Sequence, residues 1–395
     1  TELEPGWSQV IFERLDQPAE ESSAPWNNAG TGHAALCELN YTPEANGVVN
    51  VDKALKINEQ FQVSRQLWTN LVEDGVITDP RAFINAVDHT TFAQGPEQMA
   101  FMRRRYEALN DEPLFHDQEL IEDHDRFAEY LPLMAEGRDF STPVSAIRNP
   151  NGTDVNFGAL TKQYLAALSD RGTEIRYGHE VKNITREGAK WVITVKNMHT
   201  GDTRTVRANF VFVGAGGNAL PLLQKAGIPE IKGYGGFPVS GQWLRCTNEE
   251  LIAKHDAKVY GKASVGTPPM SVPHLDTRVI EGKKGLLFGP YAGWTPKFLK
   301  QGKLTDLPKS LRLHNLSTLL GVGVHEMGLT KYLITEVIKN HAARVESLRE
   351  YVPNARDEDW EIVNAGQRVQ VIKPAKAPKF GTLEFGTAVI NSAGG

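Results

Sequence analysis

A short stretch at residues 8–13, in which Val10, Ile11 and Phe12 are apolar and Glu13 is last, leads into a long loop and is the feature that most constrains the fold. The stretch predicts a short buried strand, and the small, polar residues from Asp16 to Gly32 exclude a regular helix after it. A Rossmann-type fold places an acid at the carboxyl end of such a strand to bind a ribose hydroxyl. Glycines 30 and 32 permit close approach of the backbone to a flat or phosphorylated ligand. The alternative interpretation is a surface glutamate beside an ordinary loop.

Helical and strand patterns alternate along the rest of the chain, which predicts an α/β protein (α+β overall). Apolar residues at helical spacing predict helices over residues 53–75, 96–109, 157–170 and 311–350. Strand patterns occur at 173–177, 181–185, 191–196 and 204–213, with a hairpin turn at 199–202, and short strands follow across 236–291. The acids between residues 115 and 137 predict a solvated helical face.

A second glycine segment, Gly214-Ala215-Gly216-Gly217-Asn218-Ala219, matches the dinucleotide-binding pattern G-x-G-x-x-A. It lies between a predicted strand at 211–213 and a predicted helix at 218–226. An NAD-dependent dehydrogenase built on this pattern would need a later strand that ends in an acid. No such strand follows at the required distance, so nicotinamide binding is disfavoured.

Composition excludes several classes of protein. Lys and Arg total 43 and Asp and Glu 48 in 395 residues, so the net charge of −5 and the pI near 6.1 lack the footprint of a nucleic-acid-binding protein. The two cysteines, Cys37 and Cys246, exclude a disulfide framework and fit a reducing compartment, although this one pair could still form a bridge. The sequence contains no run of about 18 apolar residues, so no membrane-spanning helix is predicted. The 11 histidines show no metal-ligand spacing, so no metal site is expected.

Several stretches of the chain resemble malate:quinone oxidoreductases, which are flavoprotein dehydrogenases. They are Trp26–Pro43, Asn149–Thr161, Pro273–Arg278, Leu287–Pro290 and Ala365–Gln370. The resemblance extends over essentially the whole chain. It implies a fold similar to the D-amino-acid oxidase group, in which a Rossmann-type domain binds FAD and a second domain holds substrate against an antiparallel sheet.

This resemblance also implies the domain organisation. Residues 1–45 and 155–235 are expected to form the FAD-binding domain, and residues 46–154 and 236–385 the substrate domain; shifts in composition near residues 46, 155 and 236 fit these crossings. The family pattern further implies a strand and a glycine turn before Thr1, and another FAD-contacting segment after Gly395.

The resemblance places FAD against particular residues. Glu13 is expected to face the adenosine ribose, Val181 the adenine, and residues 27–33 the flavin. The residues expected to bind the cofactor are Glu13, Arg14, Asn27, Asn28, Gly30, Thr31, Gly32, His33, Val181, Gly214, Ala215, Gly216 and Gly217.

A 2-hydroxy-acid dehydrogenase needs a base for the hydroxyl proton and a cation for each carboxylate. If residues 274–278 are extended, His274 and Arg278 point to one face, where Arg278 can clamp a carboxylate with two hydrogen bonds. We expect His274 to be the base and His33 a catalytic partner on the flavin side, with His33 as the rival base. The residues alone also fit a surface Asp276–Arg278 pair. Further candidates for substrate contact are Gln242, Tyr291 and Lys297.

The implied reaction is oxidation of (S)-malate to oxaloacetate, with the C2 hydride passing to FAD and the electrons then passing to a membrane quinone. This implies a protein in the bacterial cytoplasm, attached peripherally to the inner face of the cell membrane. The only compact basic run is Met102–Tyr106, which fits either a membrane contact or a solvated helix face. The alternatives are a related flavoprotein acting on 2-hydroxyglutarate or an amino acid, and a binding fragment without a cofactor.

Overall fold

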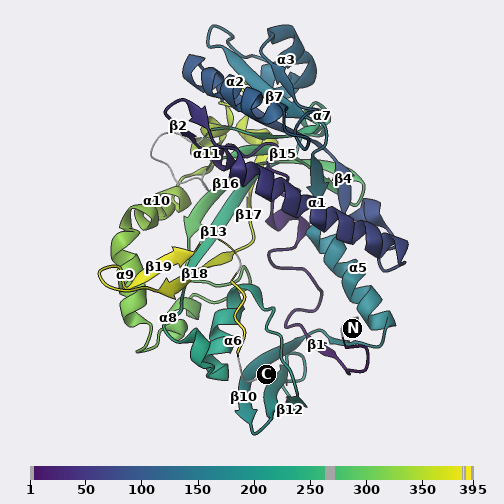
Figure 1. Ribbon diagram of the computed structural model, residues 1–395, viewed down its shortest axis with the longest axis vertical. Helices are drawn as coiled ribbons and strands as arrows, with labels where there is room; N and C mark the ends of the chain where they lie inside the picture. Colours follow the sequence, from purple (N-terminus) through teal and green to yellow (C-terminus); the bar gives the residue numbers. More distant parts are fainter. Residues whose placement is uncertain (1–3, 263–271, 385, 387, 393–395) are drawn as a thin grey trace.

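One mixed sheet dominates the structure, a computed structural model that describes residues 4–262, 272–384, 386 and 388–392. Its ten strands run in the order β19-β18-β13-β16-β15-β14-β5-β7-β6, with β17 beside β13. Neighbouring strands are antiparallel except β14 and β5. The strands are β5 (Asp88–Gln94), β6 (Glu119–Ile121), β7 (Val144–Asn149), β13 (Gly235–Cys246), β14 (Ala257–Tyr260), β15 (His274–Ile280), β16 (Lys283–Trp294), β17 (Trp360–Asn364), β18 (Arg368–Pro374) and β19 (Gly381–Glu384). Residues far apart in the sequence thus build one sheet (Figure 1).

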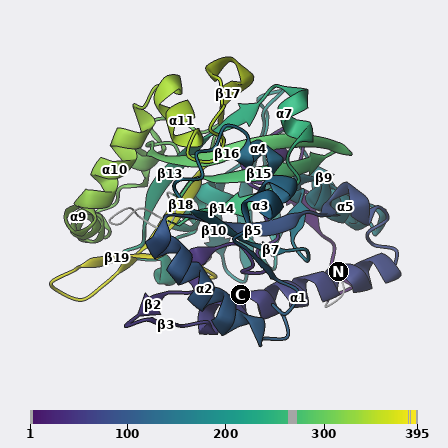
Figure 2. The same cartoon turned by 90° about the horizontal axis from the view of Figure 1, so that it is seen from above.

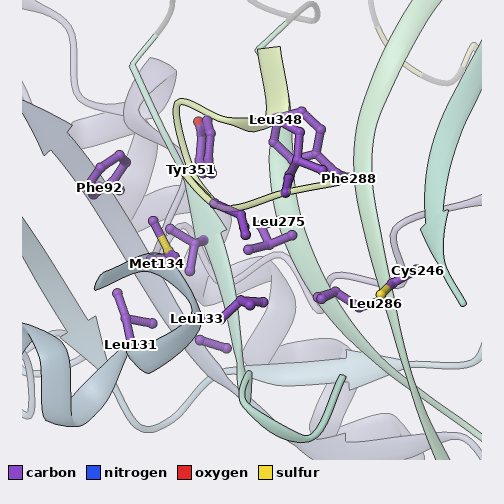
Figure 3. Packing of buried hydrophobic residues seen from close by; sticks show 14 of the residues in the cluster. Phe92, Leu131, Leu133, Met134, Cys246, Leu275, Leu286, Phe288, Leu348 and Tyr351 are labelled. Atoms are coloured by element: carbon purple, nitrogen blue, oxygen red, sulfur yellow. The ribbon is translucent and has the colours of Figure 1, made fainter. Parts of the chain in front are cut away.

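A hydrophobic core covers one face of this sheet (Figure 3). Leu275 of β15 and Phe288 of β16 are fully buried in it. Phe127, Leu133 and Leu348 reach the same core from three short helices. These helices are α3 (His124–Tyr130), α4 (Pro132–Ala135) and α11 (His341–Leu348). Because side chains alternate along a strand, the neighbours of Leu275 point to the opposite face.

On the side away from this core lie the long loop after β1 and two helices that the sequence predicts well. α1 (Asp52–Glu73) packs Phe61 against residues 34–36 and ends before Gly75, whose φ of +70° stops the helix. α5 (Phe157–Asp170) is capped by Asn156 and packs against β8 (Thr153–Val155). Further short strands are β2 (Glu44–Ala45), β3 (Val48–Val49) and β4 (Ile84–Ala86), of which β4 pairs with β8.

A smaller β region lies at the far end of the molecule, at the bottom of Figure 1. β1 (Val10–Phe12) and β9 (Glu174–Arg176) are parallel, whereas β10 (His179–Glu187), β11 (Lys190–Asn197) and β12 (Thr203–Ala208) form an antiparallel sheet. Helix α6 (Ala219–Ala226) shares their core. The division of the chain into two domains stays a prediction.

Two local predictions are wrong. Residues 211–213 pair with no described strand, and Phe212 is 82% exposed, so no strand precedes the second glycine segment. Residues 115–137 contain β6, α3 and α4, not one helical face, and Glu119 accepts a hydrogen bond from Arg126 Nε at 2.8 Å. An acid expected to be solvated is therefore part of an ion pair.

The remaining helices lie around the large sheet. They are α2 (Pro96–Asn110), α7 (Glu249–Ala253), α8 (Asp306–Ser310), α9 (Leu316–His325) and α10 (Met327–Val337). Helix α9 contacts β18 and β19, and α10 contacts β16. Both views place α9 and α10 at one edge of the molecule (Figures 1 and 2).

Candidate active site

Strand β15 brings His274 and Asp276 together on the face opposite Leu275. His274 Nδ1 is hydrogen-bonded to Asp276 Oδ2. The two side chains are 10% and 0% exposed, and Arg278 is also fully buried. The structure thus shows the predicted shared face and contradicts the alternative of a surface pair.

Aromatic rings surround His274. Tyr260 of β14 stacks on it, with ring centroids 4.0 Å apart and an interplanar angle of 5°, and Trp243 of β13 meets it edge-on at 5.5 Å. The ring of His33 meets Tyr260 edge-on at 6.3 Å. Tyr260 therefore contacts both histidines that the sequence singles out.

Buried charges continue the cluster beyond Asp276. Lys258 Nζ lies 2.8 Å from Asp154 Oδ1 and 3.8 Å from Asp276 Oδ1. Arg278 Nε donates to the same Asp154 oxygen at 2.8 Å. All four side chains are fully buried. Two cations thus face two carboxylates, which compensates each charge for its loss of water.

The structure gives Arg278 a positioning role in place of the predicted carboxylate clamp. Its Nη1 donates to Pro25 O at 2.5 Å and to Asn28 O, and its Nη2 donates to Val155 O at 3.4 Å. These carbonyls and Asp154 accept the hydrogen bonds of the guanidinium. Because Arg278 is fully buried, it has no surface open to a substrate. Arg278 therefore holds the glycine loop against β15.

The glycine loop, residues 27–33, is built onto this network. Gly30 O accepts from Val155 N at 2.6 Å, and Gly32 N donates to Thr153 O at 3.0 Å. A Cβ on Gly30 would lie 2.4 Å from Arg278 Cζ, and one on Gly32 would lie 2.0 Å from Thr153 Oγ1. These glycines are thus required by packing against protein, whereas the sequence analysis attributed them to approach of a ligand.

The other polar residues of the loop also have protein partners. Thr31 Oγ1 and Tyr260 OH share a hydrogen bond of 2.8 Å. Asn27 Nδ2 donates to Glu21 O at 2.5 Å, and Asn28 Nδ2 donates to Ser22 O at 2.8 Å. The amides fix the loop internally, and contact of residues 27–33 with a flavin stays a prediction.

A polar chain joins Gln242 to this loop. Gln242 Nε2 donates to Asn364 Oδ1 at 2.9 Å. Lys300 Nζ donates to Asn364 O at 2.8 Å and to Asn27 Oδ1 at 2.6 Å. The structure thus brings Gln242 close to the loop and adds Lys300, which the sequence analysis did not single out.

Burial and charge set the protonation states of the cluster. Desolvation, followed by the charge of His274, lowers the pKa of His33 from 6.5 to about 4, although the side chain keeps solvent access. Burial opposes ionisation of Asp276, but His274 and Lys258 outweigh it and hold its pKa below 3.8. At neutral pH His33 is therefore neutral and Asp276 is an anion.

Arg368 is the cation that sequence reasoning missed. It begins β18 and is exposed, and its guanidinium has neither a hydrogen bond nor an ion pair with any residue that the structure describes. After desolvation and the charge of His274, its charge adds to the lowering of the His33 pKa, and it opposes the burial that raises the pKa of Tyr41. Arg368 belongs to the family-like stretch Ala365–Gln370, but nothing in its spacing assigned it a role.

The second glycine segment lies against the same strand end. A Cβ on Gly217 would lie 2.1 Å from Phe298 O and 2.9 Å from Val369 Cγ2. From the other side, Gly366 N donates to Asn27 O at 2.8 Å. Residues 366–369 therefore contact both glycine segments, and Gly214 and Gly216 remain exposed.

The predicted adenosine contacts lie in the smaller β region. Glu13 follows β1 and accepts from Leu15 N at 2.8 Å through Oε1. Arg14 Nη2 lies 3.8 Å from Glu21 Oε1. Val181 packs into the core shared by β10, β11 and α6. Their roles toward a nucleotide stay predictions, as does that of Ala215 beside the exposed glycines.

Two predicted substrate contacts do not reach His274. Tyr291 is 6% exposed and donates to Arg344 O at 2.8 Å in the core on the Leu275 face. A register shift between β13 and β16 turns it away from His274, because Gln242 pairs with Tyr291 but Leu244 pairs with Phe288. Lys297 lies beyond the end of β16, and its ammonium has no bond to the His274 cluster within the described part of the chain.

The three arginines of the basic run on α2 are hydrogen-bonded to other residues of the chain. Arg103 donates to Glu122 at 2.8 Å and Arg104 to Glu44 at 2.5 Å. Arg105 is fully buried and donates to Thr42 Oγ1 at 3.1 Å. This run therefore offers little free charge to a membrane.

Other site types receive no support from the geometry. Within residues 4–262, 272–384, 386 and 388–392, no helix has the length and apolar content to cross a membrane, and no three potential ligands gather around a metal position. Cys37 and Cys246 are free and buried, and burial raises the pKa of each thiol.

Comparison with known sequences gives consistent matches. A family model described as malate:quinone oxidoreductase (Mqo) matches residues 1–395. Probable malate:quinone oxidoreductases of Corynebacterium jeikeium and Corynebacterium efficiens are 70% and 68% identical over 394 residues, and malate:quinone oxidoreductase of Corynebacterium glutamicum is 66% identical over 394 residues. Each match covers 100% of this chain and, respectively, 80%, 61% and 79% of the relative.

Comparison with solved structures supports the fold class. An L-alpha-glycerophosphate oxidase of Mycoplasma pneumoniae, reduced with dithionite and with FAD bound, gives a TM-score of 0.56 at 15% identity and covers 94% of this chain and 78% of that one. Glycine oxidase of Geobacillus kaustophilus gives a TM-score of 0.56 at 16% identity, with 91% and 76% covered. These likenesses show the fold alone, and they confirm the predicted α/β class.

Proposed function

The chain belongs to the malate:quinone oxidoreductase family, and from this premise we propose that it oxidises (S)-malate to oxaloacetate with FAD as cofactor and a quinone as electron acceptor. One observation carries the proposal from the family to the residues. It is the buried Asp276–His274 pair, stacked on Tyr260 beside the glycine loop. Acceptance of electrons by a membrane quinone would place the protein at the inner face of the bacterial cell membrane.

The residues present fit FAD. Two glycine segments meet at residues 366–369, and Glu13 follows a parallel strand, where Rossmann-type folds bind ribose. Trp243 Nε1 is buried next to His274 and has no partner among the described residues, which fits a polar ligand at this position. When bound, FAD supplies the acceptor for the hydride that leaves C2 of malate.

His274 takes the hydroxyl proton of malate in this proposal. Asp276 accepts the hydrogen bond of Nδ1, which leaves Nε2 as the proton acceptor. As the imidazolium forms, the buried carboxylate stabilises its charge. Tyr260 fixes the plane of the ring by stacking. The pair therefore orients the base toward the substrate.

His33 suits a different role. Desolvation lowers its pKa, and the carboxylate of Asp276 is hydrogen-bonded to His274 and not to His33, which favours His274 as the base. A neutral imidazole can donate one hydrogen bond and accept another. We assign His33 to hydrogen bonding on the flavin side of the substrate.

Arg368 supplies the cation for a substrate carboxylate. It carries an unpaired charge whose field reaches His33, whereas Arg278 is taken up by Asp154 and the loop. A guanidinium can bind a carboxylate through two parallel hydrogen bonds. In this proposal Arg368 therefore replaces Arg278 as the substrate clamp.

The test is an anaerobic visible spectrum of the full-length protein before and after addition of (S)-malate. The proposal predicts an oxidised-flavin band that malate bleaches and that added quinone restores. A flavin band that malate leaves unchanged would reassign the substrate. Absence of flavin, with no uptake of added FAD, would overturn the enzyme proposal.

A further inference from the structure

Helices α9 and α10 lie on one edge of the molecule (Figures 1 and 2). Together with the preceding loop they carry an exposed apolar surface, here called the α9–α10 face. Leu313 is 94% exposed, and Leu320 and Ile338 are 69% and 75% exposed. The exposed apolar residues of this face are Leu304, Leu311, Leu313, Leu316, Leu320, Val324, Met327, Ile334, Val337 and Ile338. Single exposed apolar side chains are common, but a gathering of this kind marks an interaction surface.

Helical geometry aligns these side chains. Leu316, Leu320 and Val324 recur every four residues and so share one side of α9. The other sides of the helices are used by the fold, since Val322 of α9 and Leu333 of α10 are buried in a core shared with β13 and β18. The exposed stripes are thus surplus to the packing of the domain.

The exposed charged side chains of residues 300–340 are all lysines. Residues 300–340 contain more Lys and Arg than Asp and Glu, in a chain whose net charge is −5. Lys303, Lys309 and Lys331 are exposed, whereas the acids of this stretch are not. Asp306 accepts from backbone N–H groups, and Glu336 is paired with Lys339. An apolar surface bordered by free lysines is complementary to a bilayer that contains anionic lipid.

We propose that the α9–α10 face binds the anionic surface of the membrane and so brings the active site to quinone. This inference rests on the proposed function, because quinones with long side chains dissolve in lipid. Strand β16 connects the two places: Gly289 pairs with His274, and Gly293 packs against Val337 of α10. The four intervening steps along an extended strand span about 13 Å.

Flotation with lipid vesicles tests the binding. The full-length holoenzyme is mixed with vesicles of phosphatidylcholine alone or with added phosphatidylglycerol, and the bound fraction is measured. Leu320→Glu/Val324→Glu should lower binding to anionic vesicles by at least about tenfold, because two charges would enter the interface. The matched control is Val63→Glu/Leu67→Glu, which alters exposed apolar residues four positions apart on α1 and should bind as the parent does.

Activity assays separate this inference from the proposed function. With malate and a water-soluble dye acceptor, the Leu320→Glu/Val324→Glu variant should match the parent, but its reduction of a long-chain quinone in vesicles should fall with its binding. Unchanged vesicle binding and quinone reduction in that variant would overturn the inference. So would conversion of an oligomer to a monomer with vesicle binding retained, which would show that a second copy covers the face. A parent that binds vesicles through this face but reduces no dye with malate would refute the proposed function alone.

Discussion

Replacement of Asp276 by Asn tests the role of the buried carboxylate. The change is nearly isosteric, and Lys258 keeps Asp154 at 2.8 Å as a partner, so the fold should survive with a loss of about 1–3 kcal/mol in the free energy of unfolding. The carboxylate stabilises a positive charge on His274. For charges about 4 Å apart at an effective dielectric constant near 20, that interaction is about 4 kcal/mol.

The expected effect on rate follows from this interaction. Part of this interaction energy already stabilises the ground state, and only the remainder lowers the barrier. Asp276→Asn should therefore slow flavin reduction by malate about 10²–10³-fold. The assay is anaerobic single-turnover reduction at saturating malate, with flavin content and circular dichroism measured in parallel. The control is Asp359→Asn, which alters another paired carboxylate at a distant loop and should leave the rate unchanged. A folded, flavin-containing Asp276→Asn variant within a few-fold of the parent would refute the reasoning.

Three further predictions concern the substrate clamp, the glycine loop and acid stability. Arg368→Lys should raise the KM for malate by about 10–100-fold with a smaller change in kcat, as measured by dye reduction, because a single ammonium cannot replace the planar guanidinium; an unchanged KM would exclude Arg368 from the clamp. Gly30→Ala should cost at least about 2 kcal/mol more than Gly47→Ala in urea unfolding: both residues have positive φ, but only at Gly30 would the new Cβ meet Arg278, at 2.4 Å. Equal losses would show that Arg278 moves aside freely. Desolvation lowers the pKa of buried His255 from 6.5 to about 4. Between these pH values the folded state therefore binds fewer protons than the unfolded state. The stability that results is present above pH 6.5 and is lost as the pH falls toward 4. His255→Gln should therefore reduce the loss of unfolding free energy between pH 7 and pH 5 by about 2 kcal/mol, and an unaltered pH dependence would contradict this assignment.

Local signals in the sequence were enough to predict the main helices and the location of the site. Helix α5 has the predicted bounds because its capping residue and its apolar spacing are both local features. The face shared by His274 and Asp276 follows from strand alternation alone. The strand expected at residues 211–213 failed for the opposite reason, since a strand depends on a ladder partner that local pattern does not reveal.

The chemistry of individual residues depended on distant partners. Arg278 meets Asp154, which is 124 positions away in the chain, so spacing within residues 274–278 suggested a free guanidinium. Gly30 meets the same arginine, and its lack of a side chain was attributed to a ligand. Tyr291 is turned away by the register shift between β13 and β16, which local pattern does not reveal. Arg368 gained its candidate role only when the fold showed it to be a cation without a partner.

Single-turnover reduction of the bound flavin by malate in His274→Asn and His33→Asn variants tests the central claim most directly. If His274 is the base, its variant should retain flavin and bind malate but reduce the flavin at least about 100-fold more slowly than the parent, with a smaller effect for His33→Asn. If His274→Asn reduced the flavin at a rate within a few-fold of the parent while His33→Asn was inactive, His33 would be the base, and the account would be contradicted.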